Sequence, residues 1–298
     1  MAALERLIPL LGVLVVAALL VVTRGAWVPA IGHAVPSVWR IAKITVAEAR
    51  RRRVVQAVMV LVVMILLSMT FFSYLSPQEQ SRMIISGGLA AITVFGILLS
   101  IFIAAFLIPQ EVESRTVYAI LAKPVRRFEF VLGKYLGALI ILGVIVLILT
   151  VVLVGVLVAM SRLVPSTGES AFNPNLPAVI FSAAMSYCAL AVLTALIILI
   201  STISSTTMTV ISAFIIWAVG SLQTTIHDLA EHAEGPARVV ILVLYYIVPK
   251  LENFDFRHEA SNFMRISYVS GWEAALHGLG YVAVVLLLAS IFFNDRQV

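Results

Sequence analysis

Few side chains in this sequence have types and spacing that could do chemistry. His227-Asp-Leu-Ala-Glu231-His232 pairs His227 with Glu231 and Asp228 with His232, each four residues apart. Such pairs could hold a metal ion on one helical face. The segment is not an HExxH motif, however, and an exposed polar helix explains it equally well. We therefore predict no metal site.

A second group, Gly133-Lys134, is similar to the end of a phosphate-binding loop. Position 128 is Phe and the residue after Lys134 is Tyr, so the Gly-x4-Gly-Lys-Ser/Thr cradle is missing. The sequence also lacks a Gly-x-Ser-x-Gly motif, and its single cysteine, Cys188, cannot form a disulfide framework or a thiolate metal site. We predict that the chain is not an enzyme, that it has no catalytic residue and that it binds no cofactor itself.

The elements that must position these residues are apolar helices. The chain has 298 residues, of which 62% are hydrophobic and 12% charged, and its mean hydropathy of +1.09 excludes a soluble domain. A membrane-spanning helix needs about 20 apolar residues. Period-2 alternation is absent, so we predict an all-α polytopic protein. Six runs form its core: Val54–Phe72, Met83–Ile108, Tyr135–Met160, Pro177–Ile200, Met208–Leu222 and Ala274–Phe293. The fifth is short and is expected to extend to either side.

The first five core runs contain no Asp, Glu, Lys, Arg or His, and the sixth has only Glu273 and His277 at its outer end. Carriers driven by ion gradients need ionisable or unwound sites near the membrane midplane. We interpret Glu273 and His277 as groups at the membrane interface. We therefore expect the energy that drives the protein to be supplied through its cytoplasmic loops and not by an ion gradient across the spans.

Two segments precede the core. From its length and polarity, Leu7–Val22 is predicted to be an additional N-terminal span, with a cleaved signal peptide and an interfacial helix as alternatives. The segment 36–53 reads as an amphipathic elbow helix on the inner surface, with Val38, Trp39, Ile41, Ala42, Val46 and Ala49 on one side and Arg40, Lys43, Arg50 and Arg51 on the other. A plain basic flank is the alternative. The whole chain, 1–298, reads as one transmembrane domain, with the six-span core over 54–298.

Charge gives the orientation. Twelve Lys and Arg residues flank one side of the core and six the other, and cytoplasmic loops collect the excess. This predicts an inner-membrane, multi-pass protein with a cytoplasmic C-terminus and an external loop from Gln223 to Arg265. Within that loop, Val239–Val248 is expected to rest in the outer leaflet, and Pro249–Phe256 to climb out to the polar surface. The net charge of +5 suits anionic lipid headgroups, and we expect no nucleic-acid partner.

The most charged loop, Pro109–Gly137, lies between the second and third core runs on the cytoplasmic side. Pro109 precedes a predicted helix, Glu111–Ala122, whose first turn is acidic and which Pro124 ends. This helix presents a compact apolar patch rimmed by charge, which suits a groove on a partner. A loop folded onto its own bundle is the alternative. The patch consists of Val117, Tyr118, Ile120 and Leu121.

The run from Glu113 through Thr116, Leu121, Pro124 and Arg127 to Gly133-Lys134 resembles the cytoplasmic signature of ABC-2 type permeases, and most closely those of the nitrous-oxide-reductase maturation and gliding-motility type. The basic elbow, six spans and an outer Pro-x-Leu-Glu-x-Phe-Asp are similar too, so the resemblance covers about 40–298. Two departures are Arg115, where Gly usually precedes Thr116, and the additional Leu7–Val22.

The resemblance implies an exporter-type fold with an elbow helix, six spans and a cytosolic coupling helix. Two such subunits, identical or paralogous, would pair with separate ATP-binding subunits that hold ATP and Mg. The short turn Ser201–Thr207 would be a second contact, and Gly133-x3-Gly137 would allow close helix approach. The implied ATPase-docking residues are Glu111, Glu113, Arg115, Thr116, Val117, Tyr118, Ile120, Leu121, Lys123, Pro124 and Arg127.

Two other readings stay open at this stage. The chain could be an ATPase-linked membrane anchor or mechanotransmission subunit that carries no substrate. It could also be a polytopic lipid-modifying enzyme, which the missing polar catalytic cluster disfavours.

Overall fold

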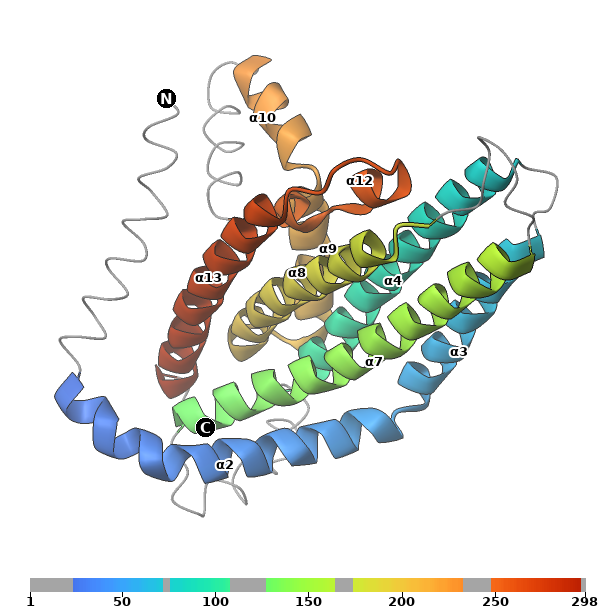
Figure 1. The fold of residues 1–298 in the computed structure, drawn as a ribbon. Coiled ribbons are helices and arrows are strands. Elements are labelled where there is room, and N and C mark those ends of the chain that lie inside the picture. Colours follow the sequence, from blue (N-terminus) through green and yellow to red (C-terminus); the bar gives the residue numbers. More distant parts are fainter. Residues whose placement is uncertain (1–23, 72–75, 108–126, 164–173, 233–247, 296–298) are drawn as a thin grey trace.

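The computed structural model describes residues 24–71, 76–107, 127–163, 174–232 and 248–295, and within these ranges all regular secondary structure is helical. Figure 1 shows a bundle of long helices with one helix, α2, lying across its lower end. The all-α polytopic fold predicted from composition is therefore confirmed.

The described helices match the predicted core runs closely. Five of them are long and apolar enough to cross a membrane. They are α3 (Arg53–Ser68, continued by the 3-10 turn η1, Met69–Phe71), α4 (Pro77–Leu107), α7 (Arg127–Leu163), α8 (Leu176–Ile203) and α13 (Tyr268–Asp295). The helices α4 and α7 run past the apolar residues at one end, because polar residues there continue the helix beyond the hydrocarbon thickness.

The fifth run forms a shorter helix than expected. Helix α9, Thr206–Ser221, has 16 residues, or about 24 Å of length against about 30 Å of hydrocarbon. It gains only two residues before Met208, and at Leu222 the backbone leaves the helical region (φ −119°, ψ 28°). A separate helix, α10 (Gln223–His232), follows, so the run is extended at its start but not at its end.

The elbow helix is present and longer than predicted. Helix α2 spans Arg24–Arg51, so Pro36 lies inside it and not at its start. Arg52 is extended (φ −72°, ψ 116°) and turns the chain into α3. Val38, Ile41 and Ala42 are buried as expected. Trp39 is the exception: it is 52% exposed and lies 5.5 Å from Lys43 Nζ, which suits the membrane interface.

The centre of the bundle is the packing of α4 on α8. Two hydroxyl pairs join these helices, Thr93 with Ser186 at 3.1 Å and Ser100 with Thr194 at 2.8 Å. Between them Gly96 gives room to Leu190, whose Cδ1 lies 2.6 Å from where a Cβ would stand. Small and hydroxyl residues at such an interface are typical of membrane helices, where close backbone approach replaces the hydrophobic effect.

The outer segment after Pro249 folds back onto the bundle. A 3-10 turn, η2 (Leu251–Phe254), leads to a short helix, α12 (Arg257–Ser261). Leu251, Phe254 and Phe256 are all buried, and Ser182 of α8 donates to the carbonyl of Phe256 at 3.1 Å. The segment therefore packs its apolar side chains against the helices, while Glu252, Asn253 and Asp255 remain exposed.

Candidate partner-docking face

The predicted ATPase-docking residues lie almost entirely outside the described residues. These are Glu111, Glu113, Arg115, Thr116, Val117, Tyr118, Ile120, Leu121, Lys123 and Pro124, and only Arg127 falls within, as the first residue of α7. The apolar patch and the coupling helix therefore remain predictions. The structure describes the helices on either side of this loop, α4 before it and α7 after it. We call these two helices and the elements packed on their loop ends the frame.

Both ends of the loop are anchored in that frame. Leu107, the last residue of α4, is buried, and Phe130 in the first turn of α7 is fully buried. The ring of Phe130 stacks on Phe293 near the end of α13, with 5.5 Å between ring centroids. Phe106 lies 5.7 Å from the guanidinium of Arg52. A force on the loop would thus reach α4, α7, α13 and the elbow together.

The elbow α2 packs very closely on the start of α7, as Figure 1 shows in outline. A Cβ at Gly133 would come within 2.7 Å of Ile41, and one at Gly137 within 2.5 Å of Thr45 and 3.0 Å of the carbonyl of Ala42. The two glycines are one turn apart and so form a single groove for α2. The predicted close approach at Gly133-x3-Gly137 is confirmed, and its partner is the elbow.

A charge network crosses the same junction. Lys134 is only 1% exposed, and its Nζ lies 3.8 Å from Glu48 Oε2 and 5.8 Å from the ring of Phe130. Glu48 also accepts a 2.8 Å hydrogen bond from Arg52. Sequence reasoning placed Lys134 among the loop charges and missed its burial. The position of Lys134 between Gly133 and Gly137 could have predicted this burial, because a side chain next to a helix-packing groove lies close to the helix that fills the groove.

The predicted second contact is the turn between α8 and α9. Ser201 and Thr202 are buried, whereas Ile203 and Met208 are exposed. Since α8 runs antiparallel to α7, its last residues return to the end of the bundle where α7 begins and where α2 lies (Figure 1). The turn and both ends of the charged loop therefore share one end of the molecule.

The remaining polar candidates are dispersed. His232 Nδ1 forms a hydrogen bond of 2.7 Å with the backbone oxygen of Asp228, and His277 Nδ1 forms one of 2.7 Å with the backbone oxygen of Glu273. Glu273 and His277 are exposed on α13, which agrees with an interfacial role. Within the described ranges, no group of three or more His, Cys, Asp or Glu residues is arranged to hold a metal. Cys188 packs partly buried against the core.

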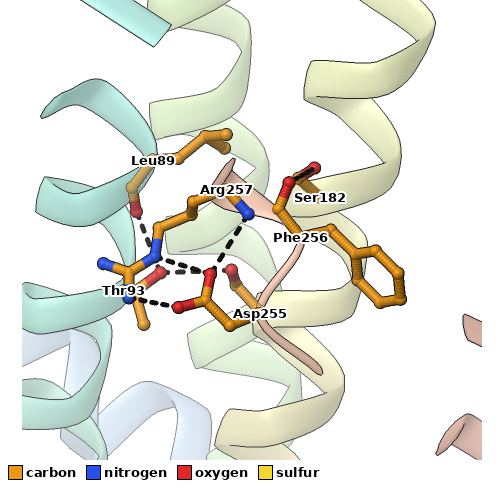
Figure 2. Close-up of polar contacts among 7 residues, drawn as sticks. Leu89, Thr93, Ser182, Asp255, Phe256 and Arg257 are labelled. Carbon is orange, nitrogen blue, oxygen red and sulfur yellow. Dashed lines mark hydrogen bonds and ion pairs between the residues drawn. The ribbon is translucent and has the colours of Figure 1, made fainter. Parts of the chain in front are cut away.

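The structure also places polar groups that sequence reasoning missed, at the end of the bundle opposite α2. Arg257 Nε and its backbone N–H donate to Asp255 Oδ1 at 2.7 Å and 3.1 Å, and Nη2 pairs with Oδ2. Figure 2 shows this pair beside Thr93 of α4. Burial tends to raise the pKa of Asp255, yet the hydrogen bonds and charge of Arg257 hold that pKa below its ordinary value. The apolar residues Leu251, Phe254 and Phe256 could have predicted that this segment packs against the helices.

One comparison with known proteins gives a family. The family model described as "ABC-2 family transporter protein" matches residues 13–298. A search among curated proteins gave no match. The match covers nearly the whole chain and agrees with the bundle of long apolar helices. This chain therefore belongs to the ABC-2 family of transporter membrane proteins.

Proposed function

We propose that this protein is the membrane-spanning permease subunit of an ATP-driven exporter, and that a separate ATPase subunit docks on the loop 109–126. Family membership supports a membrane transport component. The observation that carries the proposal further is the frame at the end of the loop, where α7 meets α13 through Phe130 and Phe293 and meets α2 through the Gly133 groove.

In this proposal the ATPase moves the loop and the frame transmits the motion. The loop enters α7 directly at Arg127, and α7 is locked to α2 by close backbone packing and by Lys134 with Glu48. Closely packed helices move as rigid bodies, because their cores resist continuous deformation. Closure of two ATPase subunits would therefore tilt α7 and the elbow together. We also propose that two copies of this chain, or one with a paralogue, pair in the membrane.

The docking helix can be tested by changing its apolar patch. Truncating an aromatic or leucine anchor in a partner groove typically costs about 2 kcal/mol or more, whereas rim charges contribute less and are screened by salt. Tyr118→Ala combined with Leu121→Ala should abolish co-purification of the ATPase and stimulation of its hydrolysis, while the subunit still inserts in the membrane. Glu113→Gln is the matched control and should have a smaller effect.

Normal binding and stimulation in the double variant would show that Glu111–Ala122 is not the coupling helix and that the loop packs on its own bundle. Transport is a separate question. If coupling is intact but reconstituted vesicles show no ATP-driven movement of any substrate, the chain acts instead as an ATPase-linked anchor or mechanotransmission subunit.

A further inference from the structure

The folded-back outer segment partly covers a pocket of about 160 Å³ that remains open on one side. Its walls come from α4, α8 and α9, and its roof from η2 and the residues up to α12. The apolar part of the wall includes Ile97, Leu190, Leu193, Trp217 and Phe254. The polar part is contributed by Thr93, Ser186, Ser221, Glu252, Asp255 and Arg257.

The base of the pocket lies within the predicted spans. Thr93 stands ten residues after Met83 and Ser186 nine after Pro177, which places both roughly 15 Å along their spans at 1.5 Å per residue. The spans carry no charged side chain there, and the charges are brought in by the loop. Glu252 and Asp255 are exposed and Arg257 is half-buried, so the charged groups stand at the open side of the pocket, above a base formed by the spans.

The lining has an excess of negative charge. The lining contains two carboxylates, Glu252 and Asp255, and one guanidinium, Arg257, which is already held by Asp255. Glu252 accepts from the backbone N–H of Thr224 at 3.1 Å and lies 2.5 Å from its hydroxyl. Each ionised carboxylate offers about four acceptor positions, so both keep acceptor capacity beyond these bonds.

The hydroxyl groups of Thr93 and Ser186, at the base of the pocket, can also accept hydrogen bonds. Thr93 Oγ1 donates to the carbonyl of Leu89 at 2.9 Å, so the Thr93–Ser186 contact of 3.1 Å uses the proton of Ser186. Ser186, which is 5% exposed, therefore has its single donor occupied and its lone pairs open. Acceptors with an aromatic wall at Trp217 favour a cation with an apolar body.

We propose that this pocket binds a small organic monocation, an ammonium group carried on an apolar body about the size of one benzene ring. The ammonium would lie near Glu252, Asp255 and the Ser186 hydroxyl, and the apolar body against Leu193 and Trp217. The size follows from the volume, since an apolar cavity of about 150 Å³ accommodates benzene. The proposal concerns this chain alone and does not depend on coupling to an ATPase.

Three probes of equal size and different charge test it: para-fluorobenzylammonium, para-fluorobenzyl alcohol and para-fluorobenzoate. Saturable binding to the full chain in lipid nanodiscs is measured by ligand-observed fluorine NMR, with empty nanodiscs subtracted for partitioning. The ammonium should bind at least about tenfold more tightly than the alcohol, a difference of about 1.4 kcal/mol. The benzoate should bind more weakly than both.

Two variants locate the site. Glu252→Gln keeps an acceptor for Thr224 but removes the charge, and should reduce the preference for the ammonium over the alcohol to about threefold or less. Ala189→Leu adds volume to the lining and should weaken the ammonium and the alcohol together. Glu273→Gln, at an exposed carboxylate on α13, is the matched control and should change neither.

Equal binding of the ammonium and the alcohol, tighter binding of the benzoate, or no saturable binding of the ammonium would overturn the proposal. An unchanged preference in Glu252→Gln, or an equal loss in Glu273→Gln, would place the charge selectivity elsewhere and contradict the assignment. If Ala189→Leu disturbs folding, Leu193→Phe fills the same wall from the next turn of α8 and serves as the second volume test.

Discussion

At the residue scale, the junction between the elbow and α7 depends on one buried cation. Lys134 is 1% exposed and Glu48 is 38% exposed, although they form one ion pair. Removing a partner from a buried pair is costly when it leaves the other charge buried without compensation. The two halves of this pair should therefore respond unequally to substitution.

We predict that Glu48→Gln destabilises the protein more than Lys134→Met does. Losing the carboxylate removes a negative charge 3.8 Å from a fully buried ammonium, and we expect a cost of about 2–3 kcal/mol. Losing the ammonium leaves Glu48 partly in solvent and still bonded to Arg52, at about 1 kcal/mol. Thermal unfolding in detergent measures both, with Arg50→Gln at an exposed site as the control; the reverse order would contradict the assigned asymmetry.

A second residue-scale prediction concerns acid. Because Arg257 lowers the pKa of Asp255, the folded carboxyl stays ionised below the ordinary value of about 3.9. Its contribution to stability is present above that value and is lost as the pH falls through the lower, folded pKa. Asp255→Asn should therefore destabilise the protein by about 1 kcal/mol at neutral pH, and by progressively less below pH ~4. A difference in melting temperature that grows on acidification would be inconsistent with a lowered pKa.

At the element scale, the glycines of α7 decide where the elbow lies. Gly133 and Gly137 stand against Ile41 and Thr45 with no room for a Cβ. A Cβ at Gly155, in the same helix, would meet no neighbouring atom of the described residues within 4 Å. One helix thus contains both the test positions and a matched control.

We predict that Gly137→Ala destabilises the protein by about 1–3 kcal/mol, because the added methyl forces α2 away from α7. Gly155→Ala should be neutral or stabilising by up to about 1 kcal/mol, since alanine favours the helix. Melting temperature reports the cost, and a cysteine pair across the α2–α7 contact reports the separation. Equal behaviour of the two variants would mean that the close approach is not needed.

At the scale of the whole molecule, the ends of the bundle differ in character. One end gathers the elbow, the loop anchors and the α8–α9 turn, and the other carries α10, η2 and α12 (Figure 1). Tyr268 and Trp272 are exposed at the start of α13, and Trp39 is exposed at the opposite end. Exposed aromatic residues of this kind are typical of the two membrane–water interfaces.

We predict that the elbow end faces the cytoplasm, as the excess of basic residues requires. In a Cys188→Ala background, a cysteine at Glu234 should react with an impermeant reagent in intact cells. A cysteine at Arg126 should react only after the membrane is permeabilised. Labelling of position 126 alone in intact cells would reverse the orientation.

We also predict that the isolated chain does not hydrolyse ATP above background, because the sequence lacks a phosphate-binding loop. Hydrolysis should appear when the ATPase subunit is added. Sustained turnover by the purified chain, after removal of contaminating ATPases, would end the proposal that it is a permease subunit.

The sequence by itself determined the spans, the elbow and the family, because hydrocarbon thickness and backbone hydrogen bonding leave a long apolar run one option, the helix. Gly133 and Gly137 were also recognisable, as small residues one turn apart. The tertiary structure alone decided what those residues meet. It set the elbow in the glycine groove, buried Lys134, ended α9 at Ser221 and folded Asp255 and Arg257 back onto the helices. Such outcomes depend on which surfaces come into contact across long stretches of chain, and side-chain burial follows from those contacts, not from local polarity.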